Sequence, residues 1–359
     1  MYENENNGKQ ILFSEPDEGG VRYYRSGNAP GVPGRRSEKK HTLRNSLIVF
    51  GCIVAGLAAL GVLYNNMIQN RDADTKLPSR DYIATVYVEG TIAGDNTDTW
   101  GNPSGYQHDW TLSEIDRLIN DHNNKGMVLY VDSPGGGIYE SDELYFKIKE
   151  YQDNTGRPVY SAMASMAASG GYYISAPADK IYANRNCWTG SIGVTIGTIV
   201  DISGFLDNYG IKTTTIASGK NKSMGGFFDP LTSDQRDIFQ ALVDEAYDQF
   251  VGIVAYERGM DLAKVKEIAD GRIYTAKQAN ELGLIDAVGT YGDAVADMMD
   301  EYGLHNCEIF DVRYVYKSLL PNLFGYINRG VYTDASVILQ LLEKQNKFPV
   351  SYLCEALAE

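Results

Sequence analysis

The sequence is poor in histidine. It has four histidines, and none lies between His122 and His305, so no imidazole from this stretch can act as a general base. The four cysteines include no closely spaced pair, which argues against a structural metal site. Basic residues are also scarce, 32 against 47 acidic ones. We therefore predict no metal, no cofactor and no nucleic-acid partner.

One long stretch has no charge at all. Residues 47–64 read LIVFGCIVAGLAALGVLY, which at about 1.5 Å per residue is long enough to cross a bilayer. A buried soluble helix is the alternative, but few such helices are apolar on every face. Basic residues gather on the amino side of the run, from Arg35 to Arg44, which predicts a cytoplasmic N-terminus. The sequence thus predicts a single-pass protein of the cell membrane with its body outside the cytoplasm.

The rest of the chain divides by composition. We expect a disordered cytoplasmic tail over residues 1–44, the transmembrane anchor over 45–66 and a polar spacer over 67–81. A folded body follows over 82–300, without an internal repeat, and then an extension over 301–359 to which the sequence assigns no role. Outside the apolar run, Cys187, Cys307 and Cys354 allow one disulfide at most.

Strand and helix patterns alternate in the body. Apolar and β-branched runs predict strands at residues 82–88, 127–131 and 159–163. Helices are expected at 141–151, at 232–258 with a Thr-Ser-Asp cap, and at 275–282 before Gly283. This alternation predicts an α/β fold with parallel strands and crossover helices.

Two small-residue loops are candidates for an active site. Ser169 lies in AASGGYY, where its small neighbours would let a substrate backbone approach and a free N–H could face an oxyanion. The motif DSPGGG, residues 132–137, follows a predicted strand and could offer a second N–H. Taken singly, each loop is also compatible with a tight packing segment or an ordinary turn.

A serine hydroxyl needs a base to become a nucleophile. In the absence of a nearby histidine, a lysine held neutral by burial is the candidate, and Lys222 in SGKNKSMGG lies close to Phe227 and Phe228. From the residues alone, Lys222 and Lys220 could equally be two solvated surface lysines.

The ordered motifs GGGIYESDELYFKI, SMAASGGYYISAPADKIYAN, TGSIGV, SGKNKSMG and ADGRIYTAKQANELGLID resemble the signal peptide peptidase SppA family over roughly residues 82–300. The resemblance implies a fold of repeated β-β-α units related to ClpP and crotonase. It implies Ser169 as nucleophile, Lys222 as general base with Lys220 as its rival, and Ser191 as the residue that orients the lysine. Gly136 and Gly170 would form the oxyanion hole. Asp132 departs from the asparagine expected before Ser-Pro-Gly-Gly.

The same resemblance implies what the protein does. We expect a membrane-anchored serine endopeptidase that degrades remnant signal peptides and therefore binds hydrophobic peptides. Because the body occurs once, we expect a homo-oligomeric ring in which Ser169 and Lys222 can come from different subunits. The alternatives are an inactive membrane scaffold of the same fold and a crotonase-like acyl-CoA enzyme.

Overall fold

The structure is a computed structural model, and it describes residues 76–97, 103–314 and 351–353, with the single positions 50 and 55. The predicted tail, nearly all of the predicted anchor and residues 67–75 of the spacer lie outside the described residues. Within the described ranges, no helix is both long enough and apolar enough to cross a bilayer. The chain separates into residues 1–74 and 75–359, and the fold below is that of the second unit. The expected domain limits remain predictions.

The strands are β1 (Tyr82–Glu89), β2 (Asn124–Ser133), β3 (Gly135–Gly137), β4 (Val159–Ala168), β5 (Lys180–Ala183), β6 (Trp188–Gly190), β7 (Ile273–Thr275), β8 (Ala287–Val288), β9 (Glu308–Val312) and β10 (Ser351–Leu353). The helices are α2 (His108–Asn120), α3 (Ile138–Thr155), α4 (Gly170–Ser175), α5 (Ser203–Asn208), α6 (Ser233–Glu257), α7 (Leu262–Ile268), α8 (Ala276–Leu282) and α9 (Tyr291–Tyr302). The predicted α/β class is confirmed.

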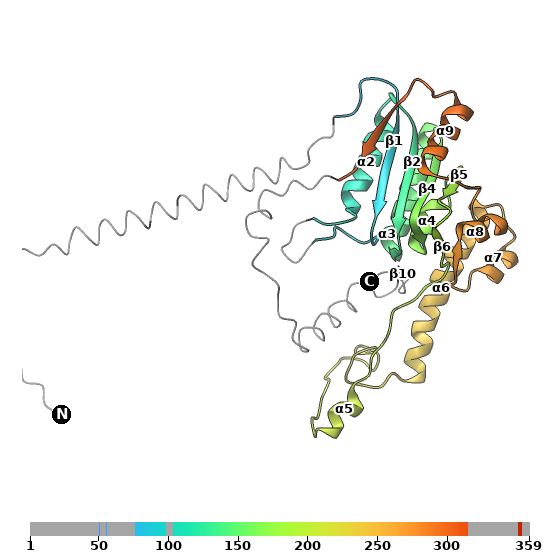
Figure 1. The fold of residues 1–359 in the computed structure, drawn as a ribbon. Helices are drawn as coiled ribbons and strands as arrows, with labels where there is room; N and C mark the ends of the chain where they lie inside the picture. The colour runs from blue at the N-terminus through green and yellow to red at the C-terminus, as the bar shows by residue number, and fades with distance from the viewer. Residues whose placement is uncertain (1–49, 51–54, 56–75, 98–102, 315–350, 354–359) are drawn as a thin grey trace, which may run out of the picture. The chain divides into compact units, whose positions relative to one another are not determined.

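The main sheet is mixed. Its strand order is β7-β6-β4-β2-β1-β9, with β5 pairing β4 and β8 pairing β5 (Figure 1). The pair β6 and β7 is antiparallel, whereas the other pairs in this sheet are parallel. Strand β4 pairs with β5 through its first half and with β6 through its last three residues. The carboxyl ends of β2, β4 and β6 therefore lie side by side.

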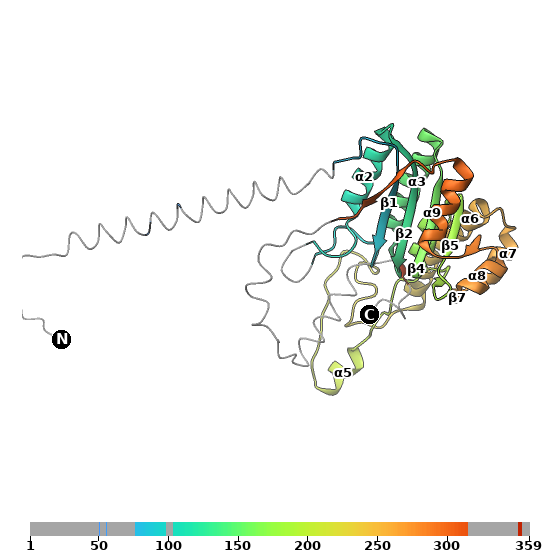
Figure 2. The ribbon, with the colours of Figure 1, turned by 45° about the horizontal axis from the view of Figure 1, so that its top comes forward.

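Helices cover both faces of the sheet. Alternate strand residues point to opposite faces, and both faces carry apolar side chains that must be buried. On one face, Ile83, Val128 and Tyr160 pack with α9 through Ala294 and Met298. On the other face, the larger core contains apolar side chains of α2, α3 and α4. Figure 2 shows α9 over the central strands β2 and β4. This two-sided burial explains why β2 and β4 read as nearly continuous apolar runs.

The predicted helix signals are confirmed. Thr232 caps α6 in a reciprocal capping box with Gln235, and α6 ends at Glu257. Helix α8 begins after Thr275 and ends at Gly283, which has a left-handed backbone. Helix α3 is longer than the expected 141–151, because it begins directly after β3 and continues to the left-handed Gly156.

An arm, defined as residues 195–231, connects β6 to α6. It contains the short helix α5 and is tied together by bonds such as that from the Ile202 N–H to the Phe227 carbonyl, 2.9 Å. Residues 207–220 are all exposed, and Ile216 is 95% exposed. Figure 1 shows α5 apart from the strands of the sheet. The arm thus contributes little to the core.

Candidate active site

Ser169 forms the junction between β4 and α4. It is only 1% exposed, and its φ of 55° is unusual for a residue other than glycine. A conformation of this kind costs on the order of 1–3 kcal/mol and persists only where the surroundings hold it. Here the Ser169 N–H donates to the Gly190 carbonyl at 2.8 Å, and its carbonyl accepts from the Tyr173 N–H in α4. The fold therefore fixes this serine at the carboxyl edge of the sheet.

The glycine loop after β2 forms the short strand β3. Ile92 donates to the Gly135 carbonyl and accepts from the Gly137 N–H, both at 2.8 Å. Along an extended strand these groups alternate sides, so the N–H and C=O of Gly136 face away from Ile92. A Cβ on Gly136 would lie 1.7 Å from the Ile92 carbonyl oxygen, so only glycine fits.

The structure brings Gly136 and Gly170 together. A Cβ built on Gly170 would lie 3.1 Å from the Gly136 nitrogen and 2.6 Å from the Ser141 hydroxyl oxygen. The two glycines named as oxyanion donors thus come from neighbouring strand ends and are in close contact, next to Ser169. The sequence could not show this distance, because 34 positions separate the two residues.

Ser191 lies on the next strand end, directly after β6. It also has a positive φ, 49°, is 7% exposed, and its N–H donates to the Arg272 carbonyl at 2.8 Å. Arg272 in turn pairs with Asp270, and this hydrogen-bonded guanidinium lowers the pKa of Asp270 to about 2. Ser191 is therefore held beside Gly190, whose carbonyl accepts from the Ser169 N–H.

Lys222 is placed differently from these residues. It lies in the arm, its side chain is exposed, and its ammonium makes no hydrogen bond or ion pair with any described residue. Because Lys222 is exposed and Phe228 is itself 47% exposed, the burial of Lys222 that the sequence predicted is absent from the single chain. Its rival Lys220 pairs with Asp234 at 3.3 Å and is 78% exposed. The single chain does not join either lysine to Ser169.

A histidine and a cysteine among the described residues are also to be considered as a general base or a nucleophile. His108 is buried, and its ring nitrogens are taken by the Tyr106 hydroxyl at 2.8 Å and Glu143 at 2.9 Å. Cys187 is buried and free, and burial raises the pKa of its thiol to about 12. A thiol with so high a pKa is a poor nucleophile. Cys307 is also free, so these two cysteines do not pair, while Cys354 lies outside the described residues.

Asp132 stands where an asparagine was expected, and its side chain bonds to the neighbouring strand β4. Its carboxylate accepts from the Ser165 hydroxyl at 2.6 Å and from the Met166 N–H at 3.1 Å. These bonds span the irregularity where β2 and β4 change register, between Val131 and Ser133. Asp132 thus ties the two strand ends together next to the glycine loop.

Strand β3 accepts a further strand on its free side. The backbone of β10 pairs with it antiparallel, with Tyr352 opposite Gly136 and Leu353 opposite Gly135. The extension to which the sequence assigned no role therefore places three of its residues along the glycine strand. An extended peptide backbone can occupy this edge.

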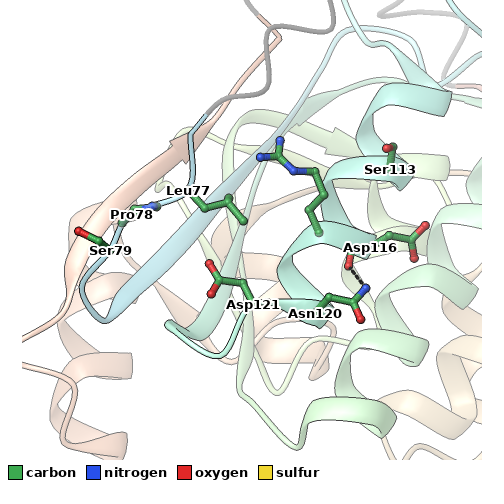
Figure 3. A pocket seen from close by; sticks show the side chains of 8 residues that line it. Leu77, Pro78, Ser79, Ser113, Asp116, Asn120 and Asp121 are labelled. Carbon is green, nitrogen blue, oxygen red and sulfur yellow. Dashed lines mark hydrogen bonds between the residues drawn. The ribbon is translucent and has the colours of Figure 1, made fainter.

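A pocket lies elsewhere, between α2 and the residues before β1 (Figure 3). It is lined by Leu77, Pro78, Ser79, Ser113, Asp116, Arg117, Asn120 and Asp121. Its polar groups are largely paired: Asn120 donates to the Asp116 carbonyl at 2.8 Å, and Asp121 accepts from the Tyr82 hydroxyl at 2.8 Å. It contains none of the predicted site residues.

The described residues thus define an α/β protein in which a strained serine and two glycine loops meet at the carboxyl edge of a mixed sheet. Residues 151–305 match the sequence profile of peptidase family S49. The matched range includes Ser169, Ser191 and Lys222.

Known proteins are similar to this chain over most of its length. A candidate signal peptide peptidase SppA of Enterococcus faecium is 38% identical over 235 residues, 66% of this chain and 68% of the relative. A candidate protease of Methanocaldococcus jannaschii is 31% identical over 84% of this chain and 96% of the relative. Protease 4 of Haemophilus influenzae is 35% identical over 64% of this chain but only 37% of its own length. This chain belongs to peptidase family S49, the family of SppA and Protease 4.

Proposed function

We propose that this protein is a membrane-anchored serine endopeptidase that cleaves remnant signal peptides with a Ser169–Lys222 dyad. The observation that carries the proposal is the edge of β3, which accepts an extended backbone antiparallel at Gly136, in close contact with Gly170 and hence beside Ser169. A peptide bound by strand addition gains main-chain hydrogen bonds, while shallow pockets for alternate side chains give specificity. Membership of a peptidase family supports the same reading.

The proposed reaction is acyl transfer through Ser169. Lys222 takes the hydroxyl proton as the serine oxygen bonds to the peptide carbonyl carbon. The N–H groups of Gly136 and Gly170 stabilise the negative oxygen, and the C–N bond breaks as the lysine returns the proton to the leaving amine. Water then attacks the ester and releases the acyl product and free Ser169.

We further propose that Lys222 reaches Ser169 from a neighbouring subunit of a homo-oligomeric ring. The exposed arm of the single chain supports this, since a lysine acting as a base must be desolvated to lower its pKa toward neutrality. Contact with a second copy would supply that burial. In the ring, Ser191 would hydrogen-bond the lysine amine and orient it.

The uncharged run over residues 47–64 supports the proposed location, a single-pass membrane protein with its catalytic body outside the cytoplasm. Such an anchor would hold the site close to hydrophobic peptides in the bilayer. The rival functions remain an inactive scaffold of the same fold and a crotonase-like acyl-CoA enzyme, which also uses glycine N–H groups around an oxyanion.

Cleavage of hydrophobic peptides by the full chain in detergent tests the proposal. The wild type is expected to hydrolyse them and to react with a fluorophosphonate at Ser169. Ser169→Ala and Lys222→Ala should be inactive, and Lys220→Ala, the matched control, should retain most of the activity. A wild type that neither cleaves nor reacts would favour the scaffold, and loss of activity in Lys220→Ala alone would move the base to Lys220.

Mixing inactive variants tests the shared site. If each dyad forms between subunits, Ser169→Ala and Lys222→Ala proteins that are dissociated and reassembled together should regain activity, because some sites then contain both intact residues. Absence of recovery in mixed oligomers shown to contain both variants would place the dyad within one chain.

A further inference from the structure

Ser141 has a buried hydroxyl with no partner among the described residues. It lies in the first turns of α3, is completely buried, and its Oγ makes no hydrogen bond with any residue that the structure describes. Buried hydroxyls in folded proteins are nearly always hydrogen-bonded, because an unmet one costs stability. Ser161 and Ser175 follow the usual pattern, since they bond to each other at 2.9 Å and Ser175 donates to the Gly171 carbonyl at 2.8 Å. Ser141 is therefore an exception that needs an explanation.

The unpartnered oxygen lies close to Gly170, on the side where Gly170 meets the glycine strand β3. The position of a Cβ on Gly170 is 2.6 Å from the Ser141 Oγ and 3.1 Å from the Gly136 nitrogen. Hence the hydroxyl and one of the proposed oxyanion donors pack against the same side of Gly170. Its hydrogen is free to rotate about the Cβ–Oγ bond, because no acceptor fixes it.

The backbone around Ser141 adds to this arrangement. Helix α3 begins directly after β3, and its N-cap Gly137 provides no side-chain cap. The first N–H groups of an 18-residue helix carry partial positive charge at the same glycine strand. A negative oxygen at Gly136 would therefore meet the positive end of α3 as well as the Ser141 hydroxyl.

We propose that Ser141 is a further hydrogen-bond donor to the oxyanion, acting with the N–H groups of Gly136 and Gly170. In the resting site its hydroxyl has no acceptor; when the carbonyl oxygen becomes negative, the hydroxyl turns toward it and donates. Such an interaction strengthens as charge develops and therefore acts on kcat more than on KM. The inference rests on the proposed peptidase function and assigns one more residue to its site.

Ser141→Ala, made in the full chain, tests the inference. Removal of one oxyanion donor is expected to lower kcat by about a hundredfold with little change in KM. The rate of fluorophosphonate labelling at Ser169 should fall in parallel, because the phosphonyl oxygen occupies the same place. The pH–rate profile should keep its shape, since Ser141 takes no part in the proton transfer. The melting temperature should stay the same or rise, because an unmet buried hydroxyl is removed.

Ser175→Ala is the matched control. It removes a buried hydroxyl that is hydrogen-bonded and leaves Ser161 without its partner, so it should lower the melting temperature and leave kcat unchanged. Ser141→Ala is thus expected to lower kcat without lowering the melting temperature, and Ser175→Ala to lower the melting temperature without lowering kcat. If Ser141→Ala does not fold, Ser141→Cys keeps the shape and replaces the hydroxyl with a weak donor.

The outcomes separate the two claims. A folded Ser141 variant whose kcat falls by less than about fivefold, against the hundredfold expected for a lost donor, overturns the role of Ser141 while the peptidase stands. A parallel loss of stability and rate also overturns it, since packing alone would then explain the effect. A wild type without Ser169-dependent cleavage or labelling overturns the proposed function and this inference with it.

Discussion

Ser169 and Ser191 stand out at the scale of single residues. Among the described residues they are the two that adopt positive φ without being glycine, at 55° and 49°. Both follow the last residue of neighbouring strands, and each is fixed by a backbone bond of 2.8 Å. Because a glycine would adopt these angles with less strain, the serine side chains are retained at a cost in stability.

That cost predicts a difference between two inactive variants. Ser169→Gly and Ser169→Ala both remove the hydroxyl, but only glycine relieves the positive φ. We expect the glycine variant to have the higher free energy of unfolding, by roughly 1 kcal/mol after its larger unfolded-state entropy is allowed for. Urea denaturation of both proteins measures the difference. Equal stabilities would mean that the turn at Ser169 relaxes in the alanine variant.

The residues of the candidate site were partly predictable. The family resemblance named Gly136 as an N–H donor, and the structure adds a reason for glycine that no local pattern contains: the Ile92 carbonyl leaves no room for a Cβ. Ser141 was not predicted, because the features that point to it are a close approach to Gly170, 29 positions away, and a hydroxyl without a partner among the described residues. The exposure of Lys222 could not be read from its apolar neighbours, because closeness in sequence to Phe227 and Phe228 does not show whether the lysine is covered.

At the scale of elements, the helices with local signals were predicted well. A capping threonine and a terminal glycine act within a few residues, so Thr232, Thr275 and Gly283 marked the ends of α6 and α8 correctly. The pairing of β4 with both β5 and β6, and the antiparallel β7, depend on long-range register. Such register is not encoded in a single strand's pattern.

The two capped helices differ in how they are packed, which predicts different effects of the same change. In α6, every residue of which the structure describes, none before Phe250 is buried, whereas α8 buries Ala276 and Ala279. Loss of either cap, by Thr232→Ala or Thr275→Ala, should cost about 1 kcal/mol locally. At α6 the loss should appear as faster amide exchange in its first turns with little change in melting temperature. At α8 it should lower the melting temperature.

A fall in melting temperature as large for Thr232→Ala as for Thr275→Ala would contradict this. It would mean that the exposed half of α6 unfolds together with the body.

At the scale of the whole molecule, the arm is a part of the described chain that the fold leaves largely uncovered. It presents apolar side chains to solvent, with Phe205 60%, Tyr209 70% and Ile216 95% exposed. A ring of subunits would give these side chains a partner and would give Lys222 the burial that a neutral lysine needs. The same contact would thus serve assembly and catalysis.

This link predicts the effect of a charge on the arm. Burial of an isoleucine side chain contributes roughly 1.5–3 kcal/mol, so Ile216→Asp should weaken each subunit contact by at least that amount. We expect light scattering to show smaller particles than for the wild type, and peptide cleavage to fall with them. The free energy of unfolding of the single chain should be unchanged, because Ile216 is already exposed there.

Thr213→Asp is the control, because it adds the same negative charge at a nearby exposed position without removing an apolar side chain. If Ile216→Asp retains both the particle mass and the activity of Thr213→Asp, this face of the arm lies outside the subunit contact, and the proposed link between assembly and catalysis through Ile216 is wrong.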